Sequence, residues 1–160
     1  MKKCSLAVAI VLLSACSTVP QPTQTEVSLV PPTKVQPGYY KLVKDAEYFI
    51  DTASVWEDNE DKHLIHFDVV INSNKGLFVY KDNPELYAKS LREYKIMNCK
   101  NFHLTQVRTD FYSEFWGQGL RAAPKFQTRH TIALHKNSTL YTLGQVMCAN
   151  LYRSSKLEQG

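Results

Sequence analysis

Several features that mark special classes of protein are missing from this sequence of 160 residues. Only 6 glycines and 7 prolines are present, which excludes a collagen-like chain. The apolar run Leu6–Leu13 is far shorter than the roughly 20 residues of a membrane-spanning helix, which excludes a multi-span membrane protein. A large excess of one charge is missing too: the formal net charge is +4, and +2 without Lys2 and Lys3, which argues against nucleic-acid binding.

What is present is typical of one globular domain. Hydrophobic residues make up 44% of the chain and charged residues 21%, which is incompatible with a disordered protein. A single domain of this length buries about two thirds of the surface that its unfolded chain exposes. We therefore expect a genuine hydrophobic core and no dense disulfide scaffold.

The first sixteen residues have the pattern of a lipoprotein leader. Lys2 and Lys3 precede an apolar run, and Leu13–Cys16 resembles a bacterial lipobox, in which cleavage leaves an acylated cysteine. We expect residues 1–15 to be a signal peptide and Cys16 to be an anchor, since several acyl chains suffice for stable membrane attachment. An ordinary secretory cleavage site beside a chance cysteine is the alternative. Ser17, where Asp would favour retention at the inner membrane, points to the outer membrane.

Proline marks a tether ahead of the domain. Five of the seven prolines lie between residues 17 and 38, among Thr, Gln and Ser, a composition that favours extended, solvated chain. We expect residues 16–38 to be a lipidated tether and residues 39–160 to be one folded domain. Within the tether, Val27–Val30 is apolar enough to dock on that domain.

Only two cysteines are left for a bridge in an oxidising compartment. Cys4 leaves with the leader and Cys16 is the expected lipid site, so Cys99 and Cys148 are the candidates for a disulfide. Two free buried thiols are the alternative.

From Tyr39 onward, apolar residues mostly alternate with polar ones, and β-branched and aromatic residues are frequent, which predicts strands. Ser73–Gly76 is typical of a hairpin turn. Asn83 followed by proline and an acidic residue predicts a single helical turn. The expected strands are Tyr40–Lys44, Glu47–Asp51, His63–Asn72, Leu77–Tyr80, Ser90–Asn98, Phe102–Phe111 and Thr128–Leu134.

The hydrophobic period changes near the C-terminus. A stripe at helical spacing follows a candidate cap at Asn137-Ser138 and predicts an amphipathic helix. A bridge from Cys148 to Cys99 would pin this helix to the sheet, because a disulfide requires nearby Cα atoms. The expected fold class is therefore α+β, an antiparallel β-sheet with a C-terminal α-helix packed on one face and tied by a disulfide. The stripe consists of Leu140, Leu143, Gly144, Met147 and Leu151.

Four longer stretches carry a family resemblance: Ile50–Trp56, Arg92–Cys99, Leu104–Tyr112 and Glu114–Pro124. Together with the lipobox and the spacing of the two cysteines, they resemble the surface-adhesin protein E family of bacterial lipoproteins. The resemblance implies an outer-membrane adhesin, displayed at the surface, that binds host vitronectin, laminin and plasminogen and aids attachment and complement evasion. It implies the same fold, a possible homodimer and possible haem binding.

The family's vitronectin-binding stretch matches Pro84–Arg108, which is also the most basic part of this chain. Clustered cations suit acidic protein segments or glycosaminoglycans. On an alternating strand Arg92 and Tyr94 share one face and Lys95 the other, so the cations cannot form one flat patch. Glu85, Leu86 and Glu93 depart from the family pattern. The candidate contacts are Lys89, Arg92, Tyr94, Lys95, Lys100 and Arg108.

The family's laminin-binding stretch matches Lys41–Asp68. Its acidic loop Glu57–Asp61 is by itself typical of a solvated turn. Aromatic residues at 111, 112, 115 and 116 are expected to pack in the core rather than to contact a ligand. The candidate laminin contacts are Lys41, Lys44, Trp56 and Lys62.

No catalytic pattern is present, and we predict that the chain is not an enzyme. His63 and His66 point to opposite faces of a strand and cannot chelate one metal ion. Gly117–Gly119 lacks the third glycine of a nucleotide-binding loop. Two alternatives to adhesion stay open: a haem-binding surface lipoprotein, with an axial His or Tyr, and a structural lipoprotein that faces the periplasm.

Overall fold

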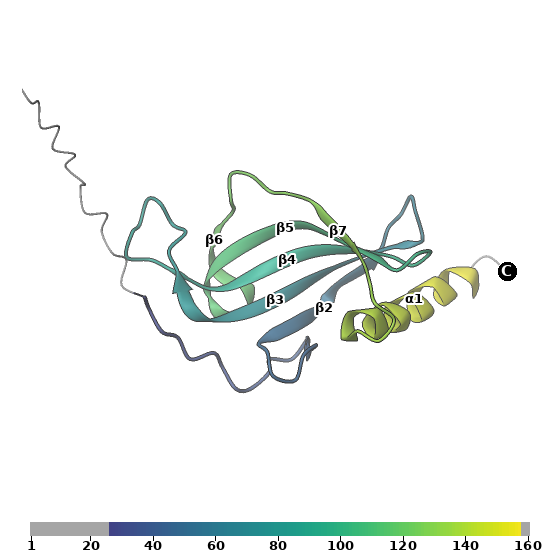
Figure 1. The fold of residues 1–160 in the computed structure, drawn as a ribbon, viewed down its shortest axis with the longest axis horizontal. Coiled ribbons are helices and arrows are strands. Elements are labelled where there is room, and N and C mark those ends of the chain that lie inside the picture. Colours follow the sequence, from purple (N-terminus) through teal and green to yellow (C-terminus); the bar gives the residue numbers. More distant parts are fainter. Residues whose placement is uncertain (1–25, 158–160) are drawn as a thin grey trace, which may run out of the picture.

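A computed structural model describes residues 26–157, with side chains described as far as residue 150; the leader and Cys16 lie outside the described residues. The chain forms one seven-stranded antiparallel sheet and a C-terminal helix (Figure 1). No helix within residues 26–157 is long and apolar enough to cross a bilayer. The elements are β1 (Tyr39–Lys41), β2 (Tyr48–Glu57), β3 (Leu64–Leu77), β4 (Ala88–Asn98), β5 (His103–Glu114), the 3-10 helix η1 (Phe115–Gly117), β6 (Gln118–Ala122), β7 (His130–Ala133) and α1 (Thr139–Leu157).

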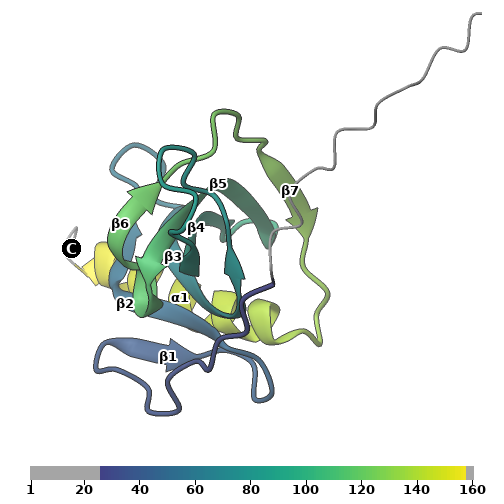
Figure 2. The same cartoon turned by 90° about the vertical axis from the view of Figure 1, so that its left-hand side faces the viewer.

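The strands follow one another as neighbours, in the order β1-β2-β3-β4-β5-β6, and β7 also pairs with β5. Both partners fit on β5 because β6 pairs with its second half and β7 with residues His103–Gln106. Figure 2 looks at the sheet from the side and shows it curled. The sheet has two unlike faces. We call the face covered by α1 the inner face and the opposite face, which η1 partly covers, the outer face.

The inner face carries the main core, under α1. Ile65, Phe67 and Val69 alternate along β3 and join Met97 of β4 and Met147 of α1 in one buried cluster. Because successive side chains on a strand point to opposite faces, the residues between them lie on the outer face. Both faces of β3 are buried, which explains its nearly continuous apolar run.

The outer face is partly covered by η1. The ring of Trp116, only 3% exposed, lies 4.7 Å from the ring of Phe49 and 5.1 Å from that of Tyr39. Its backbone N–H donates to Asn72 Oδ1 at 2.9 Å. Trp116 therefore packs in the interior, as expected, although η1 and β6 themselves were not predicted.

The fold class predicted from the sequence is confirmed. Cys99 and Cys148 form a disulfide with their Cα atoms 5.7 Å apart, which ties α1 to the loop after β4. Ser138 caps the helix, because its Oγ accepts the N–H of Tyr141 at 3.1 Å. Gly144 allows close packing, since a Cβ there would lie 2.9 Å from Met97 Cε.

The hairpin turn predicted at Ser73–Gly76 is wrong, because β3 runs through these residues to Leu77. The segment before the domain supplies the pairing that extends the strand. Leu29 N–H donates to Asn74 O at 2.8 Å, and Gly76 N–H donates to Val27 O at 2.7 Å. The docking expected for Val27–Val30 is thus present. The separate strand predicted at Leu77–Tyr80 is wrong, because β3 ends at Leu77 and residues 78–80 belong to no strand.

Two other local predictions differ from the structure. The residues around Pro84 form turns and no helix. β2 extends past the predicted end at Asp51 to Glu57, across a register shift. Ser54 bridges this irregularity, because its Oγ donates to Asp51 O and accepts the N–H of Asp68. Because this side chain replaces backbone pairing at the register shift, the alternation of apolar and polar residues is interrupted there, and the sequence gives no sign that the strand continues.

Removing the disulfide should destabilise the domain. The two cysteines are 49 residues apart, and closing a loop of this size is worth about 4 kcal/mol in the chain-entropy model. We expect the C99A/C148A variant to lose about 3 to 4 kcal/mol in urea unfolding. Wild-type protein treated with dithiothreitol is the matched control, and its urea midpoint should be close to that of the C99A/C148A variant. An unchanged midpoint in both would contradict this role.

Candidate contact surface on the outer face

The fold makes neighbours of the two predicted binding stretches. Residues 41–68 include β2 and the first part of β3, whereas residues 84–108 include β4 and the first half of β5. β3 and β4 pair in register from Leu64–Asn98 to Asn72–Ser90. The stretches therefore meet along a shared line of backbone hydrogen bonds, and their outer-face side chains touch.

Arg92 is held by acidic residues of the other stretch. Its Nη1 donates to Asp51 Oδ2 at 2.7 Å and to Asp68 Oδ2 at 2.9 Å, and its Nη2 donates to Tyr39 OH at 3.3 Å. Burial opposes the charge, but the hydrogen bonds to Asp68 and Asp51 outweigh it and raise the pKa of Arg92. The charge of Arg92 is thus used in contacts within the domain and is not available to a partner. Gly117 lies against this guanidinium, where a Cβ would sit 2.9 Å from Nε.

Beside Arg92, four flat groups stand next to one another across β2 to β5, and we call them the outer-face row: Trp56, His66, Tyr94 and Arg108. The ring of Trp56 stacks on that of His66, with centroids 3.9 Å apart and planes 6° apart. His66 Nδ1 is hydrogen-bonded to Tyr94 OH. The Arg108 guanidinium lies 5.1 Å from the centroid of the Tyr94 ring.

The two ends of the row are open to solvent. Trp56 is 44% exposed, and the side chain of Arg108 is 53% exposed. His66 between them is only 6% exposed. Trp, Tyr and Arg are the residues that most often dominate protein interfaces. The row therefore offers two exposed anchors on a rigid base.

The acidic loop at Glu57–Asp61 is attached to this row. His66 Nε2 lies 2.8 Å from Asp58 Oδ2. Asp58 Oδ1 accepts the N–H of Glu60 at 2.8 Å and that of Asp61 at 3.0 Å. The N–H groups of Asp61 and Glu60, followed by the contact with His66, lower the pKa of Asp58. The loop is thus an ordered part of the surface and more than a solvated turn.

Lys95 does not reach the surface. It lies on the inner face and is 5% exposed. Its Nζ is 2.8 Å from Glu93 Oε2 and donates to Gln106 Oε1 at 3.2 Å. Tyr48 OH donates to the same Glu93 carboxylate, and burial together with this carboxylate raises the pKa of Tyr48. Lys95 is therefore part of a buried polar cluster, and it cannot form a contact site with Arg92.

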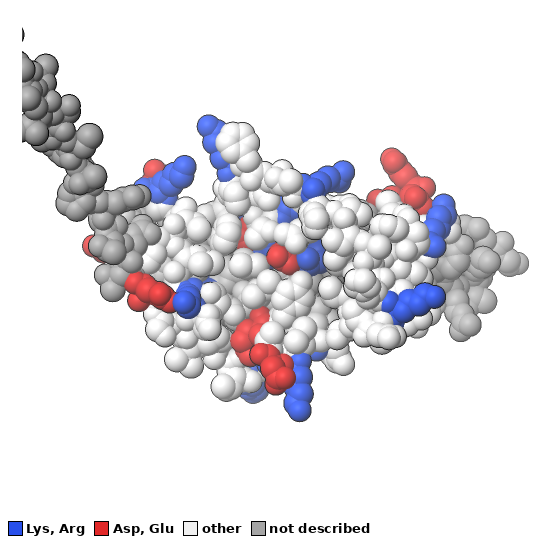
Figure 3. Space-filling model, in the orientation of Figure 1, with Lys and Arg blue, Asp and Glu red and all other residues white. Residues whose placement is uncertain are grey.

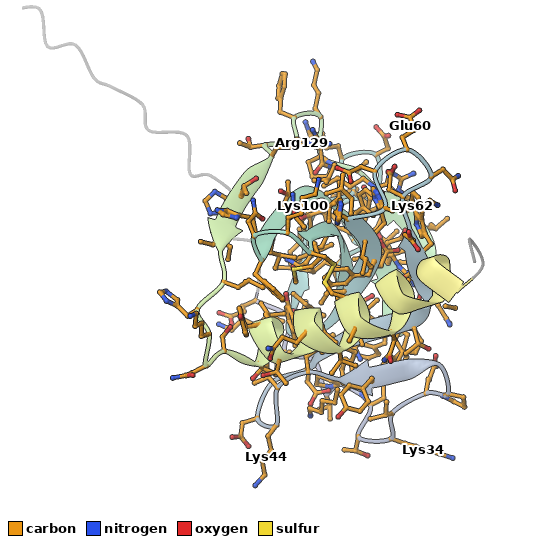
Figure 4. All side chains as sticks on the ribbon, turned by 90° about the vertical axis from the view of Figure 1, so that its right-hand side faces the viewer. Lys34, Lys44, Glu60, Lys62, Lys100 and Arg129 are labelled. Carbon is orange, nitrogen blue, oxygen red and sulfur yellow. A yellow bond between two sulfur atoms is a disulfide. The ribbon has the colours of Figure 1, made fainter. Side chains whose placement is uncertain are left out.

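The other predicted lysines are spread over the surface. Lys89 forms an ion pair with Glu114, and Lys41 forms one with Glu47. Lys62 lies 3.9 Å from Glu57. Figure 4 places Lys62 and Lys100 at one end of the molecule and Lys44 on the other side of α1. Figure 3, in the orientation of Figure 1, shows basic and acidic side chains interspersed on the face toward the viewer. The basic stretch of sequence does not fold into one basic patch.

Two residues that the sequence analysis did not name as contacts belong to this region: the buried His66, considered there only as a metal ligand, and the exposed Arg129. His66 holds the row together, and Arg129 lies close enough to lower the pKa of Tyr94, although burial sets the net direction, which is upward. Period-two alternation places His66 on the same face as Asp68. Nothing in the sequence places Arg129, since only the pairing of β7 with β5 brings it here.

The described residues do not define a haem or metal site. They contain no group of three His, Cys, Asp or Glu side chains that could hold a metal ion. Tyr80, His103 and Tyr40 each line a different surface cavity. One axial ligand suffices for haem, but no observation favours one of these three over the others, and we assign no haem site.

Comparisons with known families, sequences and structures all find relatives of the same kind. Residues 39–149 match the family model described as Surface-adhesin protein E. Two proteins of that name from strains of Haemophilus influenzae are 51% and 50% identical to this chain over 160 residues, with 99% of each chain covered. The crystal structure of protein E from non-typeable Haemophilus influenzae is 56% identical with a TM-score of 0.76, covering 81% of this chain and 88% of that chain. A second structure of Haemophilus influenzae protein E is 55% identical with a TM-score of 0.74, covering 80% and 96%.

The Asp58 carboxylate should make stability depend on acid pH. Its pKa is lowered in the folded state, so its contribution is present above the unfolded value of about 3.9 and is lost as the pH falls through the folded value. We expect D58N to melt below wild type at pH 7, and the gap to close below about pH 4. Asp45, which makes no hydrogen bond or ion pair among the described residues, gives the control D45N. Parallel melting curves for D58N and wild type at all pH values would contradict this prediction.

Replacing Lys95 should cost far more stability than replacing an exposed lysine. K95M leaves the Glu93 carboxylate without its partner in a largely buried site, and we expect a loss of about 3 kcal/mol in urea unfolding. E93Q/K95M should recover part of this loss, because no unpaired charge stays behind.

The matched control is K89M. Its pair with Glu114 is solvent-exposed, so the cost should be below about 1 kcal/mol. Equal losses for K95M and K89M would show that the buried pair has no special role.

Proposed function

The chain belongs to the surface-adhesin protein E family, and we propose that it is an adhesin of the bacterial cell surface. Its relatives are named for adhesion rather than catalysis, which agrees with the prediction that it is not an enzyme. The partners that we propose are host vitronectin, laminin and plasminogen, through which the protein would promote attachment and complement evasion.

We place the contact on the outer-face row. The observation that carries this choice is the contact between the two stretches: Trp56 and His66 come from residues 41–68, and Tyr94 and Arg108 come from residues 84–108. A partner that binds either stretch at this face would meet residues of the other. One surface would then serve more than one host protein.

The geometry of the row supports a binding role on energetic grounds. Association costs free energy for each flexible side chain that it immobilises. Trp56 is already held by stacking on His66, whose two ring nitrogens are both engaged, and Arg108 already lies over Tyr94. The two exposed anchors should therefore lose little freedom on binding.

We also propose that Cys16 is acylated and anchors the protein in the outer membrane. Palmitate label that depends on Cys16 would support this anchor, and label retained by the C16A variant would contradict it. Protease treatment of intact cells separates surface display from the periplasmic alternative, because only a displayed domain would be degraded.

Removing both anchors of the row should weaken vitronectin and laminin binding together. We expect W56A/R108Q to bind each immobilised protein at least tenfold more weakly, since each hot-spot truncation typically costs more than 1 kcal/mol. The measurement is surface plasmon resonance with residues 17–160. Soluble vitronectin should also compete with laminin for the chain.

The matched control is L120A/K125Q, which removes an exposed apolar residue and an exposed cation outside the row. It should bind like wild type. If W56A/R108Q binds as well as the control and melts normally, the contact lies elsewhere on the molecule. Loss of vitronectin binding alone would mean that the two ligands use separate surfaces.

A further inference from the structure

A second feature lies away from the outer-face row, on the side of the molecule that carries α1. A groove of about 410 Å³ runs between this helix and strands β1 and β2. None of the residues that line it is charged. Tyr40, 65% exposed, and Val146, 53% exposed, stand on its rim. The lining consists of Tyr40, Leu42, Ile50, Thr52, Val55, Thr139, Thr142, Leu143, Val146 and Met147.

The chemistry of the lining limits what can bind. Thr52 Oγ1 already donates to Gly38 O, and Thr142 Oγ1 donates to Ser138 O. Few polar groups are thus left for a ligand. A sugar, a nucleotide or a peptide backbone would lose its hydrogen bonds to water without replacement, which is costly. An unbranched apolar chain pays no such penalty.

Two lysines outside the lining lie near one end of the groove in the sequence or in the fold. The groove reaches the first residue of α1, Thr139, whose first turn contains no acidic residue. Lys44 lies on the loop between β1 and β2, on the same side of the molecule as the start of the helix, and its exposed side chain extends away from α1 into solvent (Figure 4). Lys136 precedes the helix by three residues, and Asp45 is the one acid on the loop from 42 to 46. The balance at this end favours an anionic head group.

We propose that this groove binds a fatty acid, with its acyl chain along α1 and its carboxylate at the Thr139 end near Lys44. The lining positions on the helix run from Thr139 to Met147, a length of about 12 Å at 1.5 Å per residue. That length suits a medium acyl chain. The site is independent of the proposed adhesion surface.

A chain-length series tests the proposal. Residues 17–160, which include every described residue, are titrated by calorimetry with octanoate, decanoate and dodecanoate below their micelle concentrations. Affinity should rise about fourfold for each added methylene and then level off once the chain is longer than the groove. Absence of binding by all of these acids, or an increase without a plateau as in nonspecific partitioning, would overturn the site.

Two variants locate the ligand. V146E places a charge on the exposed rim and should reduce dodecanoate affinity more than tenfold, whereas I132E, a substitution at a similarly exposed residue of β7, should not. K44Q should weaken dodecanoate about threefold and leave dodecanol unchanged, as expected for one exposed charge. Equal affinities for V146E and I132E would overturn the proposal.

A second copy of the chain is the competing occupant. Sedimentation velocity on wild type and V146E distinguishes the two cases. The fatty acid site requires that wild type bind dodecanoate without a change in its oligomeric state. A dimer that V146E dissociates, with no dodecanoate binding by wild type, would assign the groove to the dimer and overturn the proposal.

Discussion

The antiparallel register between β3 and β4 is the constraint on which the rest of this structure depends. It sets Ile65 opposite Met97 on the inner face, where α1 covers both, and Asp68 opposite Tyr94 on the outer face. Because side chains alternate along a strand, a shift by one residue would exchange the two faces. The core would then face solvent, and the outer-face row would be buried under the helix.

The two faces satisfy their polar groups in different ways. On the outer face, Arg92 forms ion pairs with Asp51 and Asp68, and His66 links Tyr94 to the loop at Asp58. On the inner face, Lys95 and Glu93 form a pair that is nearly closed to solvent. Both arrangements tie neighbouring strands together, so cations that would suit an acidic partner instead hold the sheet in place. The binding that we propose therefore relies on the exposed ends of the row rather than on the number of positive charges.

The proposed adhesion surface and the apolar groove lie on different parts of one scaffold. The row stands on β2 to β5, whose pairing is extensive, whereas the groove needs α1 to stay close to the sheet edge. The disulfide between Cys99 and Cys148 holds the helix against the sheet at the loop after β4. The proposed protein-binding surface and the proposed apolar site therefore share no residue.

The sequence by itself determined the fold class, the helix near the C-terminus and the long central strands, because periodicity is a local signal that reflects burial directly. It also named Cys99 and Cys148 as the candidates for the disulfide, because Cys4 and Cys16 are expected to be used elsewhere. It also determined the family, through stretches such as Arg92–Cys99. Only the tertiary structure decided that β3 continues through Ser73–Gly76, where the docked Val27–Leu29 segment supplies the missing hydrogen bonds. Only it decided that Lys95 is buried, that Arg92 is neutralised and that Trp56 stacks on His66. A basic residue has the same charge in the sequence wherever it folds, and its availability to a partner depends on carboxylates and rings that distant parts of the chain bring beside it.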